Sequence, residues 1–558
     1  MDELRSRSLL LRAPADGATR TAEDIVAAAR ADYGRLVGVL YDNGYFAPVV
    51  EIRLDGREAA GLSPFEAVTS VRTVEIRVEP GAPFRLGEAR IGPLAPETDL
   101  PERFRPGARA TTPLLRDTTE AALAAWRAQG HATADVGDQS IRARNRAALL
   151  DVAIRIDAGP VITFGRLLPE GQEQMRTERI LEIAGLPTGA VFSPETLDRA
   201  AERLRETGVS SAVALRLRDP RAGDVADVTA ILDEAPLRRL GFGAEIASDE
   251  GLTLSAYWLH RNLFGGAERL RFDASVSGIR DTEAGIDAEL TALFERPATF
   301  SPETGFSLEL AAVYLDERFF QSERLSLEAL LTHRLSDRVT LSGGVGLSYD
   351  RFDSALGSSD VARLTLPLSA RYDGRDDPLD ARSGLYGKVT ATPFTSFDDG
   401  GARLALDARG YLSFGAEART RLAGRARLGT VAGGSLVEIP PDHLFYSGGS
   451  GTVRGQPYQS LGALQGGVET GGRSFAGLSG EVRHDIGDTN FGVVGFADAG
   501  AVTAGSWGSG NSDWHAGAGL GLRYATPFGP IRVDLATPVT GDDAGRAAFL
   551  YIGIGQSF

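Results

Sequence analysis

Several features that many proteins carry are missing from this sequence of 558 residues. It has no cysteine, which excludes a disulfide scaffold and a thiolate metal site. No apolar run approaches the length of about 18 residues that a membrane-spanning helix needs. Residues 1–5 lack the charged and apolar segments of a signal peptide, so we expect a mature or trimmed form if the protein is exported. The formal net charge of −16 and the absence of Lys/Arg-rich runs argue against a nucleic-acid partner.

Sequence motifs of enzymes and metal sites are also missing. The chain has no His-Glu-x-x-His and no Gly-x-Ser-x-Gly motif, and its glycine-rich stretch 448–455 lacks the spacing and the lysine of a P-loop. In the acidic turn 373–380, Arg375 interrupts the alternating acids that a calcium loop requires. We therefore expect no enzymatic activity, no cofactor and no metal site, with an outer-membrane hydrolase as a remote alternative. The histidines are scattered along the chain, at His131, His260, His333, His443, His484 and His515.

From residue 238 onward, hydrophobic and polar residues alternate with a period of two. In residues 269–277, for example, Leu270, Phe272, Ala274 and Val276 share one face. We count sixteen such segments, which begin near residues 238, 252, 267, 286, 304, 321, 338, 362, 384, 402, 418, 473, 490, 514, 529 and 546. A soluble sandwich would also alternate, but an even number of strands with short turns on one side favours an antiparallel transmembrane β-barrel. The 68 glycines, concentrated in this half, fit strands that bend and pack closely.

The first 237 residues contain three copies of a smaller pattern. Residues 74–81, 152–159 and 228–236 are similar alternating strands that recur about 76 to 78 residues apart. Helical periodicity precedes them in residues 22–43, 112–129 and 194–207, and a glycine follows each helical stretch. We therefore predict three small α+β domains, each with the order helix, helix, strand, strand, and we expect the first copy to lack its opening strand. They could be generic domains or modules that bind an extended peptide at a sheet edge.

The longest interruption of the strand pattern in the C-terminal half, residues 432–472, contains a glycine-rich stretch with the tripeptide Val453-Arg454-Gly455. An interruption of this length inside a compact array is more often functional than structureless. Odd-numbered connections are the longer ones, so this loop should start outside the cell and the N-terminal domains should lie in the periplasm. We expect the loop to fold into the barrel.

An arginine inside a narrow barrel needs an acidic partner. In the strand near residue 490, Phe496, Asp498 and Gly500 occupy the polar face, so Asp498 is the predicted partner of Arg454. The alternation of neighbouring strands places four more polar side chains in the lumen: Glu481, Arg483, Arg532 and Asp534.

Closure of the barrel requires the first and last strands to pair. We predict that this pairing forms a lateral seam that can open and lend its edge to an incoming strand. The residues assigned to the seam are Leu240, Phe242, Ala244, Ile552, Gly553, Gly555 and Phe558.

The motifs described above resemble those of a known protein family. Val453-Arg454-Gly455, Phe496-Ala-Asp498-Ala-Gly500, the turn 375–380 and the stretch 519–534 resemble the bacterial POTRA-barrel superfamily of outer-membrane insertases and transporters. Three repeats before a sixteen-stranded barrel are most similar to the TamA-type members, which belong to the translocation and assembly module. The resemblance implies POTRA-like domains at residues 1–80, 81–158 and 159–236, a barrel at 237–558, and contact between Arg454 and Asp498. One residue departs from the family pattern: Gln456 stands where an aromatic is usual.

The resemblance also implies a place in the bacterial outer membrane and a function. The expected function is assembly or translocation of β-barrel and autotransporter proteins, without a cofactor. Expected partners are outer-membrane lipid, nascent polypeptides bound by β-strand addition, and an inner-membrane-anchored TamB-like protein at the N-terminal POTRA-like domain. A two-partner secretion transporter, which exports an unfolded polypeptide through its barrel, remains the alternative.

Overall fold

The computed structural model describes residues 2–11, 21–62, 68–247, 251–279, 285–397, 399–415, 418–465, 467–526, 529–541, 544–554, 556 and 558. Among these residues, no helix is long and apolar enough to cross a membrane. The chain divides into two compact units. The first comprises Met1–Leu168, Leu186–Ala200 and Leu215–Ala230, and the second comprises Pro169–Gly185, Ala201–Ala214 and Ile231–Phe558.

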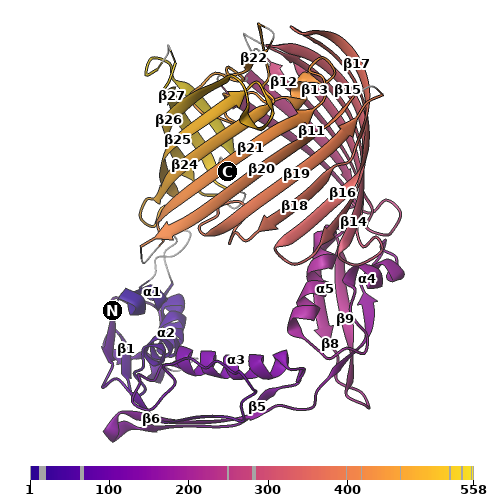
Figure 1. Cartoon of the computed structure of the whole chain (residues 1–558). Helices are drawn as coiled ribbons and strands as arrows, with labels where there is room; N and C mark the ends of the chain where they lie inside the picture. The colour runs from indigo at the N-terminus through magenta and orange to yellow at the C-terminus, as the bar shows by residue number, and fades with distance from the viewer. Residues whose placement is uncertain are drawn as a thin grey trace. The chain divides into compact units, whose positions relative to one another are not determined.

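Three small sheets occupy the N-terminal residues (Figure 1). The strand orders are β2-β1-β3, β4-β6-β5 and β7-β9-β8. The sheets fall within the predicted ranges 1–80, 81–158 and 159–236, although the border between the two compact units passes through the third sheet. The elements are α1 (Asp2–Arg7), α2 (Ala22–Asp42), β1 (Val49–Leu54), β2 (Arg57–Glu58), β3 (Val74–Glu79), β4 (Arg85–Gly92), α3 (Thr112–Ala128), β5 (Asp135–Arg144), β6 (Leu149–Asp157), β7 (Thr163–Glu170), α4 (Thr177–Ala184), α5 (Pro194–Glu206), β8 (Ser210–Leu217) and β9 (Val225–Glu234).

The three predicted helices, now α2, α3 and α5, are confirmed within one or two residues. A capping box between Thr21 and Asp24 begins α2, and Gly44, with φ of +81°, follows its end. Buried side chains of α3 pack on the apolar face of β6, which forms the second core. The expected order of two helices before each strand pair is wrong for the second repeat, because residues 93–111 between β4 and α3 contain no helix.

The second half of the chain forms a closed barrel whose strands run obliquely around it (Figure 1). Every predicted segment overlaps a strand of the barrel. The segment predicted near residue 362 is divided into β17 and β18, which both pair with β16 and with β19, so the strand count depends on whether this interrupted strand is counted once or twice. The strands are β10 (Arg238–Ala247), β11 (Gly251–His260), β12 (Arg269–Ile279), β13 (Asp287–Arg296), β14 (Thr304–Glu317), β15 (Phe320–Arg334), β16 (Val339–Ser354), β17 (Gly357–Thr365), β18 (Leu368–Asp373), β19 (Gly384–Thr395), β20 (Gly400–Phe414), β21 (Thr420–Gly433), β24 (Ser474–Asp485), β25 (Phe491–Thr503), β26 (Ser512–Tyr524), β27 (Ile531–Pro538) and β28 (Phe549–Ile554).

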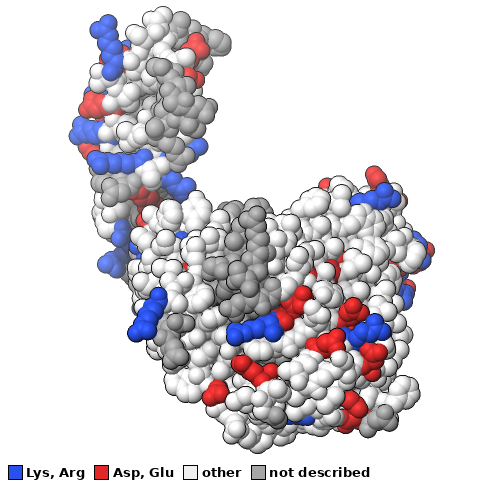
Figure 2. Space-filling view, turned by 90° about the horizontal axis from the view of Figure 1, so that it is seen from above, with Lys and Arg blue, Asp and Glu red and all other residues white. Residues whose placement is uncertain are grey.

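The alternation in sequence becomes an outer and an inner face of the barrel wall. On β15, Leu325 and Leu327 are exposed on the outside, whereas Arg324 points inward and contacts Asp350 of β16. Figure 2 shows the molecule from above: uncharged residues cover most of the visible surface, and charged side chains gather in small groups. An apolar outer face and a polar lumen are the arrangement that a barrel surrounded by lipid requires.

Helix α4 belongs to the same compact unit as the barrel. Arg179 on α4 is buried and donates hydrogen bonds to the carbonyl oxygens of Pro297, at 2.6 Å, and of Gly266, at 3.4 Å. These carbonyls lie in the turns β11–β12 and β13–β14. One arginine therefore fastens the helix to two turns of the barrel.

Candidate functional site: the inward loop and the barrel seam

The loop between β21 and β24 includes a short helical turn η3 (Pro441–His443) and a small hairpin of β22 (Ala463–Gln465) and β23 (Val468–Thr470). Its tip needs glycine at two places. Gly448 has φ of +118°, and a Cβ there would lie 2.0 Å from the carbonyl oxygen of Pro457. Gly455 has φ of +89°, and a Cβ there would lie 2.6 Å from the carbonyl oxygen of Thr537 on β27. These glycines let the loop turn tightly and lie directly against the inner wall.

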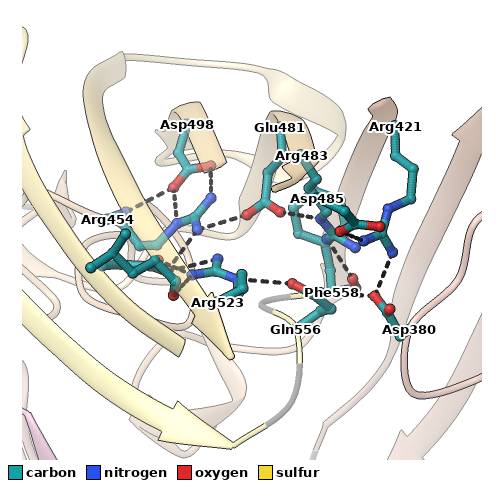
Figure 3. Close-up of polar contacts among 12 residues, drawn as sticks. Asp380, Arg421, Arg454, Glu481, Arg483, Asp485, Asp498, Arg523, Gln556 and Phe558 are labelled. Carbon is teal, nitrogen blue, oxygen red and sulfur yellow. Dashed lines mark hydrogen bonds and ion pairs between the residues drawn. The ribbon is translucent and has the colours of Figure 1, made fainter. Parts of the chain in front are cut away.

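Arg454 at the loop tip contacts three carboxylates from three strands (Figure 3). Its Nε lies 2.7 Å from Oδ2 of Asp498, and its Nη2 lies 3.1 Å from Oδ1 of the same residue, a two-pronged contact. Its Nη1 lies 2.7 Å from Glu481 on β24 and 3.3 Å from Asp534 on β27. The guanidinium also stacks 3.6 Å from the ring centre of Phe496.

These groups are almost completely buried: Arg454 is 2% exposed and Asp498 is 3% exposed. Burial alone would lower the pKa of Arg454, but the hydrogen bonds and charges of Asp498, Glu481 and Asp534 outweigh burial and raise it. The guanidinium is therefore firmly charged, and it holds the loop to the wall.

Two further arginines balance this cluster. Arg483 donates to Glu481 at 2.8 Å, and Arg523 of β26 forms an ion pair with Asp534 at 2.5 Å. Three guanidinium groups thus face three carboxylates within the described lumen. Arg483, Glu481 and Asp534 were predicted in the lumen, but Arg523 was not. The alternation on β26, with exposed Leu520 and Leu522, could have placed Arg523 on the inner face.

Arg532, also predicted in the lumen, lies on β27 in register with Arg523. It is only partly buried, and the loop tip reaches Asp534 rather than Arg532 in the contacts above.

The two residues after Arg454 reach the last strands of the barrel. The backbone N–H of Gly455 donates to the hydroxyl of Tyr551 on β28 at 3.1 Å. The side-chain amide of Gln456 donates to the carbonyl oxygen of Ala516 at 2.8 Å and of Thr540 at 3.2 Å. Where the resemblance implied an aromatic, the buried amide of Gln456 therefore ties the loop to β26 and to the connection after β27.

The base of the loop is attached to strands on another part of the wall. Asp442 forms an ion pair with Arg324, and Nη2 of Arg324 lies 3.1 Å from Nδ1 of His443. Asp350, which is completely buried, lies between Arg324, at 2.6 Å, and Arg363, at 2.9 Å. This second attachment was not predicted, because it joins residues that are distant in sequence and carry no local motif.

The seam between the first and last strands is short. β10 pairs with β11 over ten residue pairs, whereas the described ladder between β10 and β28 has two, Ile246 with Ile552 and Ala247 with Tyr551. Leu240 is 67% exposed and Phe242 is 84% exposed.

The other residues predicted to lie at the seam occupy different positions in the structure. Ala244 is exposed on β10, Ile552 pairs with Ile246 across the seam, and Gly553 lies on β28 in register with Arg532 of β27; Gly555 lies outside the described residues. The assignment of Phe558 to the seam is wrong. Its side chain is 8% exposed and packs with Ala381, Tyr411 and Ala423.

Gln556 and Phe558 lie in the lumen, where their polar and apolar groups contact other residues. Arg483 donates to the carbonyl oxygen of Phe558 at 3.1 Å and lies over its ring. Gln556 accepts a hydrogen bond from Arg523 at 3.0 Å and donates to Asp380 at 2.9 Å (Figure 3).

The fold and the site together define a class: a closed β-barrel whose lumen holds an inward loop fixed by an arginine and a ring of carboxylates. Comparison with known families gives the assignment. Residues 262–558 match the Omp85 superfamily domain, so the chain belongs to the Omp85 superfamily. Family membership and the closed barrel support a place in the bacterial outer membrane.

Individual relatives are more distant. The outer membrane protein assembly factor BamA of Nitratidesulfovibrio vulgaris (strain Hildenborough) is 22% identical over 443 residues, which cover 75% of this chain and 53% of the relative. The chain thus spans about half the length of that curated relative.

Two solved structures share the fold. BamA from Haemophilus ducreyi lacking POTRA domains 1-3 has a TM-score of 0.64 at 17% identity, and covers 85% of this chain and 100% of its own. CdiB from Acinetobacter baumannii has a TM-score of 0.53 at 12% identity, with 84% and 89% covered. At these identities the likeness supports the fold alone.

Proposed function

We propose that this protein assembles β-barrel or autotransporter proteins in the outer membrane by lending the edge of β10 to an incoming strand. One observation carries the proposal: β10 is fully paired with β11, but its described pairing with β28 is limited to its last two residues. Most of one edge of β10 can therefore accept a new partner. An extended segment adds to such an edge through backbone hydrogen bonds alone, so client sequences can differ widely.

Opening the described part of the seam costs little. Among the described residues, two pairs join β10 to β28, and a hydrogen bond contributes a net stability of about 0.5 to 1.5 kcal/mol. An unpaired backbone group in lipid costs several kcal/mol, which gives an incoming strand a strong reason to pair with the open edge. The outward side chains Leu240 and Phe242 would face lipid on that edge.

Within the Omp85 superfamily, we propose a TamA-type protein. The proposal is supported by three small sheets before the barrel and by the Val453-Arg454-Gly455 and Phe496-x-Asp498-x-Gly500 motifs at the loop contact. On this proposal the N-terminal domains at 1–80, 81–158 and 159–236 lie in the periplasm, and the first of them meets a TamB-like partner. The protein would work without a cofactor.

Export through the lumen, as in a two-partner secretion transporter, is the second candidate. The barrel fold that the chain shares with CdiB is compatible with it. The loop argues against an open pathway, because it is attached to the wall at Asp442 and again at Arg454. A transporter should show a large pore that its substrate gates, whereas an assembly factor should conduct little.

A disulfide across the seam tests the proposed function. The chain has no native cysteine, and Ile246 and Ile552 are direct Cα partners, so the pair I246C/I552C can lock the seam. We expect the oxidised protein to lose assembly of a client barrel in proteoliposomes and to regain it after reduction. The control pair L412C/L422C, which joins β20 to β21 in the intact wall, should assemble equally well in both states. Undiminished assembly with the locked seam would refute the proposal.

A further inference from the structure

Tyr551 occupies two positions of interest at once. On one side it is a seam residue, because it pairs with Ala247 of β10 in the short ladder. On the other side its hydroxyl lies in the lumen and accepts the hydrogen bond from the backbone N–H of Gly455. The side chain is 2% exposed, and its ring packs with Val494, Phe496 and Ala536. It thus joins the residue after Arg454 to the last strand at the point where the seam closes.

The contacts around Tyr551 make this connection short and rigid. Arg454 is fixed by Asp498 and by Asp534, and Asp534 is the direct neighbour of Tyr551 across the β27–β28 ladder. A shift of the loop tip would therefore withdraw the N–H of Gly455 from the tyrosine hydroxyl. Leaving a buried donor without a hydrogen-bond partner costs free energy, so movement of the loop tip together with β28 is favoured over movement of either one alone.

We propose that Tyr551 is the positioning residue through which the inward loop holds the seam closed. With the loop in place, the Gly455–Tyr551 hydrogen bond keeps β28 against the end of β10. When the loop tip leaves its carboxylates, β28 loses this support and the seam opens. The proposal deepens the proposed function, on which it rests, by naming the residue that couples loop position to the seam.

The test measures the seam itself rather than client assembly. In the I246C/I552C background, the rate of disulfide formation under mild oxidation in liposomes reports how often the seam is closed. Tyr551→Phe keeps the ring and removes the hydroxyl that accepts the hydrogen bond from Gly455. We expect it to slow disulfide formation, by at most about fivefold, the factor that corresponds to one hydrogen bond of ordinary net strength. Client assembly can fail or succeed independently of this rate, so failure of the coupling and failure of the assembly function remain distinguishable.

Two controls separate coupling from a general structural effect. Tyr386→Phe removes a hydroxyl from β19, where the ring lies under Arg375 and Arg409, and should leave the rate unchanged. Gln456→Leu removes the amide bonds to Ala516 and Thr540 but spares Tyr551, and should slow the rate less than Tyr551→Phe. Heat-modifiable migration on gels verifies that each variant is a folded barrel.

A double variant tests the direction of the coupling. Arg454→Gln frees the loop tip and should itself slow disulfide formation. If Tyr551 acts through the loop, adding Tyr551→Phe to Arg454→Gln produces no further slowing. Three outcomes would each overturn the proposal. The first is equal rates for Tyr551→Phe and Tyr386→Phe, and the second is equal slowing by Gln456→Leu and Tyr551→Phe. The third is additive effects of Arg454→Gln and Tyr551→Phe.

Discussion

Neutralising either member of the Arg454–Asp498 pair gives a quantitative test of the loop attachment. In Arg454→Gln, Glu481 keeps Arg483 and Asp534 keeps Arg523, but Asp498 loses the partner that contacts both of its oxygens. One carboxylate, 3% exposed, is then left without its cation. Stranding a buried charge costs about 3 to 5 kcal/mol, and water entering the lumen reduces that cost. We expect a loss of about 3 kcal/mol in the free energy of unfolding.

The reverse substitution should cost less. In Asp498→Asn, the guanidinium of Arg454 still contacts Glu481 at 2.7 Å and Asp534 at 3.3 Å, so its charge stays compensated. The loss is then one charge-assisted hydrogen-bond pair, about 1.5 to 3 kcal/mol.

A double-mutant cycle in urea, with the barrel in liposomes, measures the coupling. Once Arg454 is neutral, Asp498→Asn removes an unpaired charge and should cost little or even stabilise. The double variant should therefore lose less than the sum of the single losses. Strict additivity, or a larger loss for Asp498→Asn than for Arg454→Gln, would refute the assignment of the pair as the main attachment of the loop.

Three further predictions concern other parts of the chain. Arg324→Gln, which breaks the ion pair with Asp442 at the base of the loop, should raise single-channel conductance in planar bilayers while the Arg454 contacts persist. In the third sheet, the backbone N–H of Arg166 donates to Asp227 and, with nearby arginines, lowers the pKa of that carboxyl. A carboxyl whose pKa is lowered in the folded state stabilises the sheet above about pH 4, and this stabilisation is lost as the pH falls further. Hydrogen exchange of the Arg166 amide, corrected for its intrinsic rate, should therefore accelerate in acid. Asp227→Asn should abolish this acid dependence. Thr21→Ala removes the N-cap of α2 and should weaken that helix by about 0.5 to 2 kcal/mol, measured by hydrogen exchange along the helix.

Local patterns in the sequence predicted much of the fold. Alternation with a period of two predicted segments that overlap the described barrel strands, although it did not predict the division into β17 and β18, and it placed Asp498 on the inner face. Glycine after a helical stretch marked the ends of the three predicted helices, as at Gly44. These features depend on neighbouring residues only, so a single sequence contains them.

Features that depend on distant residues were not predictable in this way. The pairing of Asp442 with Arg324 and the docking of Arg179 on two barrel turns join segments far apart in the chain. The position of Phe558 was predicted wrongly for the same reason. In sequence, Phe558 continues the alternating pattern of Ile552, which predicts a position on the same strand. In the structure, Phe558 instead contacts residues in the lumen such as Arg483.

The most direct test of lateral assembly is to find where a client strand lies. Single cysteines at positions 240–244 of β10 can be crosslinked to a client that carries cysteines along its terminal strand and is stalled during assembly. Pairing in register along the free edge of β10 predicts that each step along β10 shifts the crosslink by one residue in the client, in antiparallel or parallel order. Crosslinks confined to lumen positions such as Thr452, with none along β10, would contradict lateral assembly and favour export through the barrel.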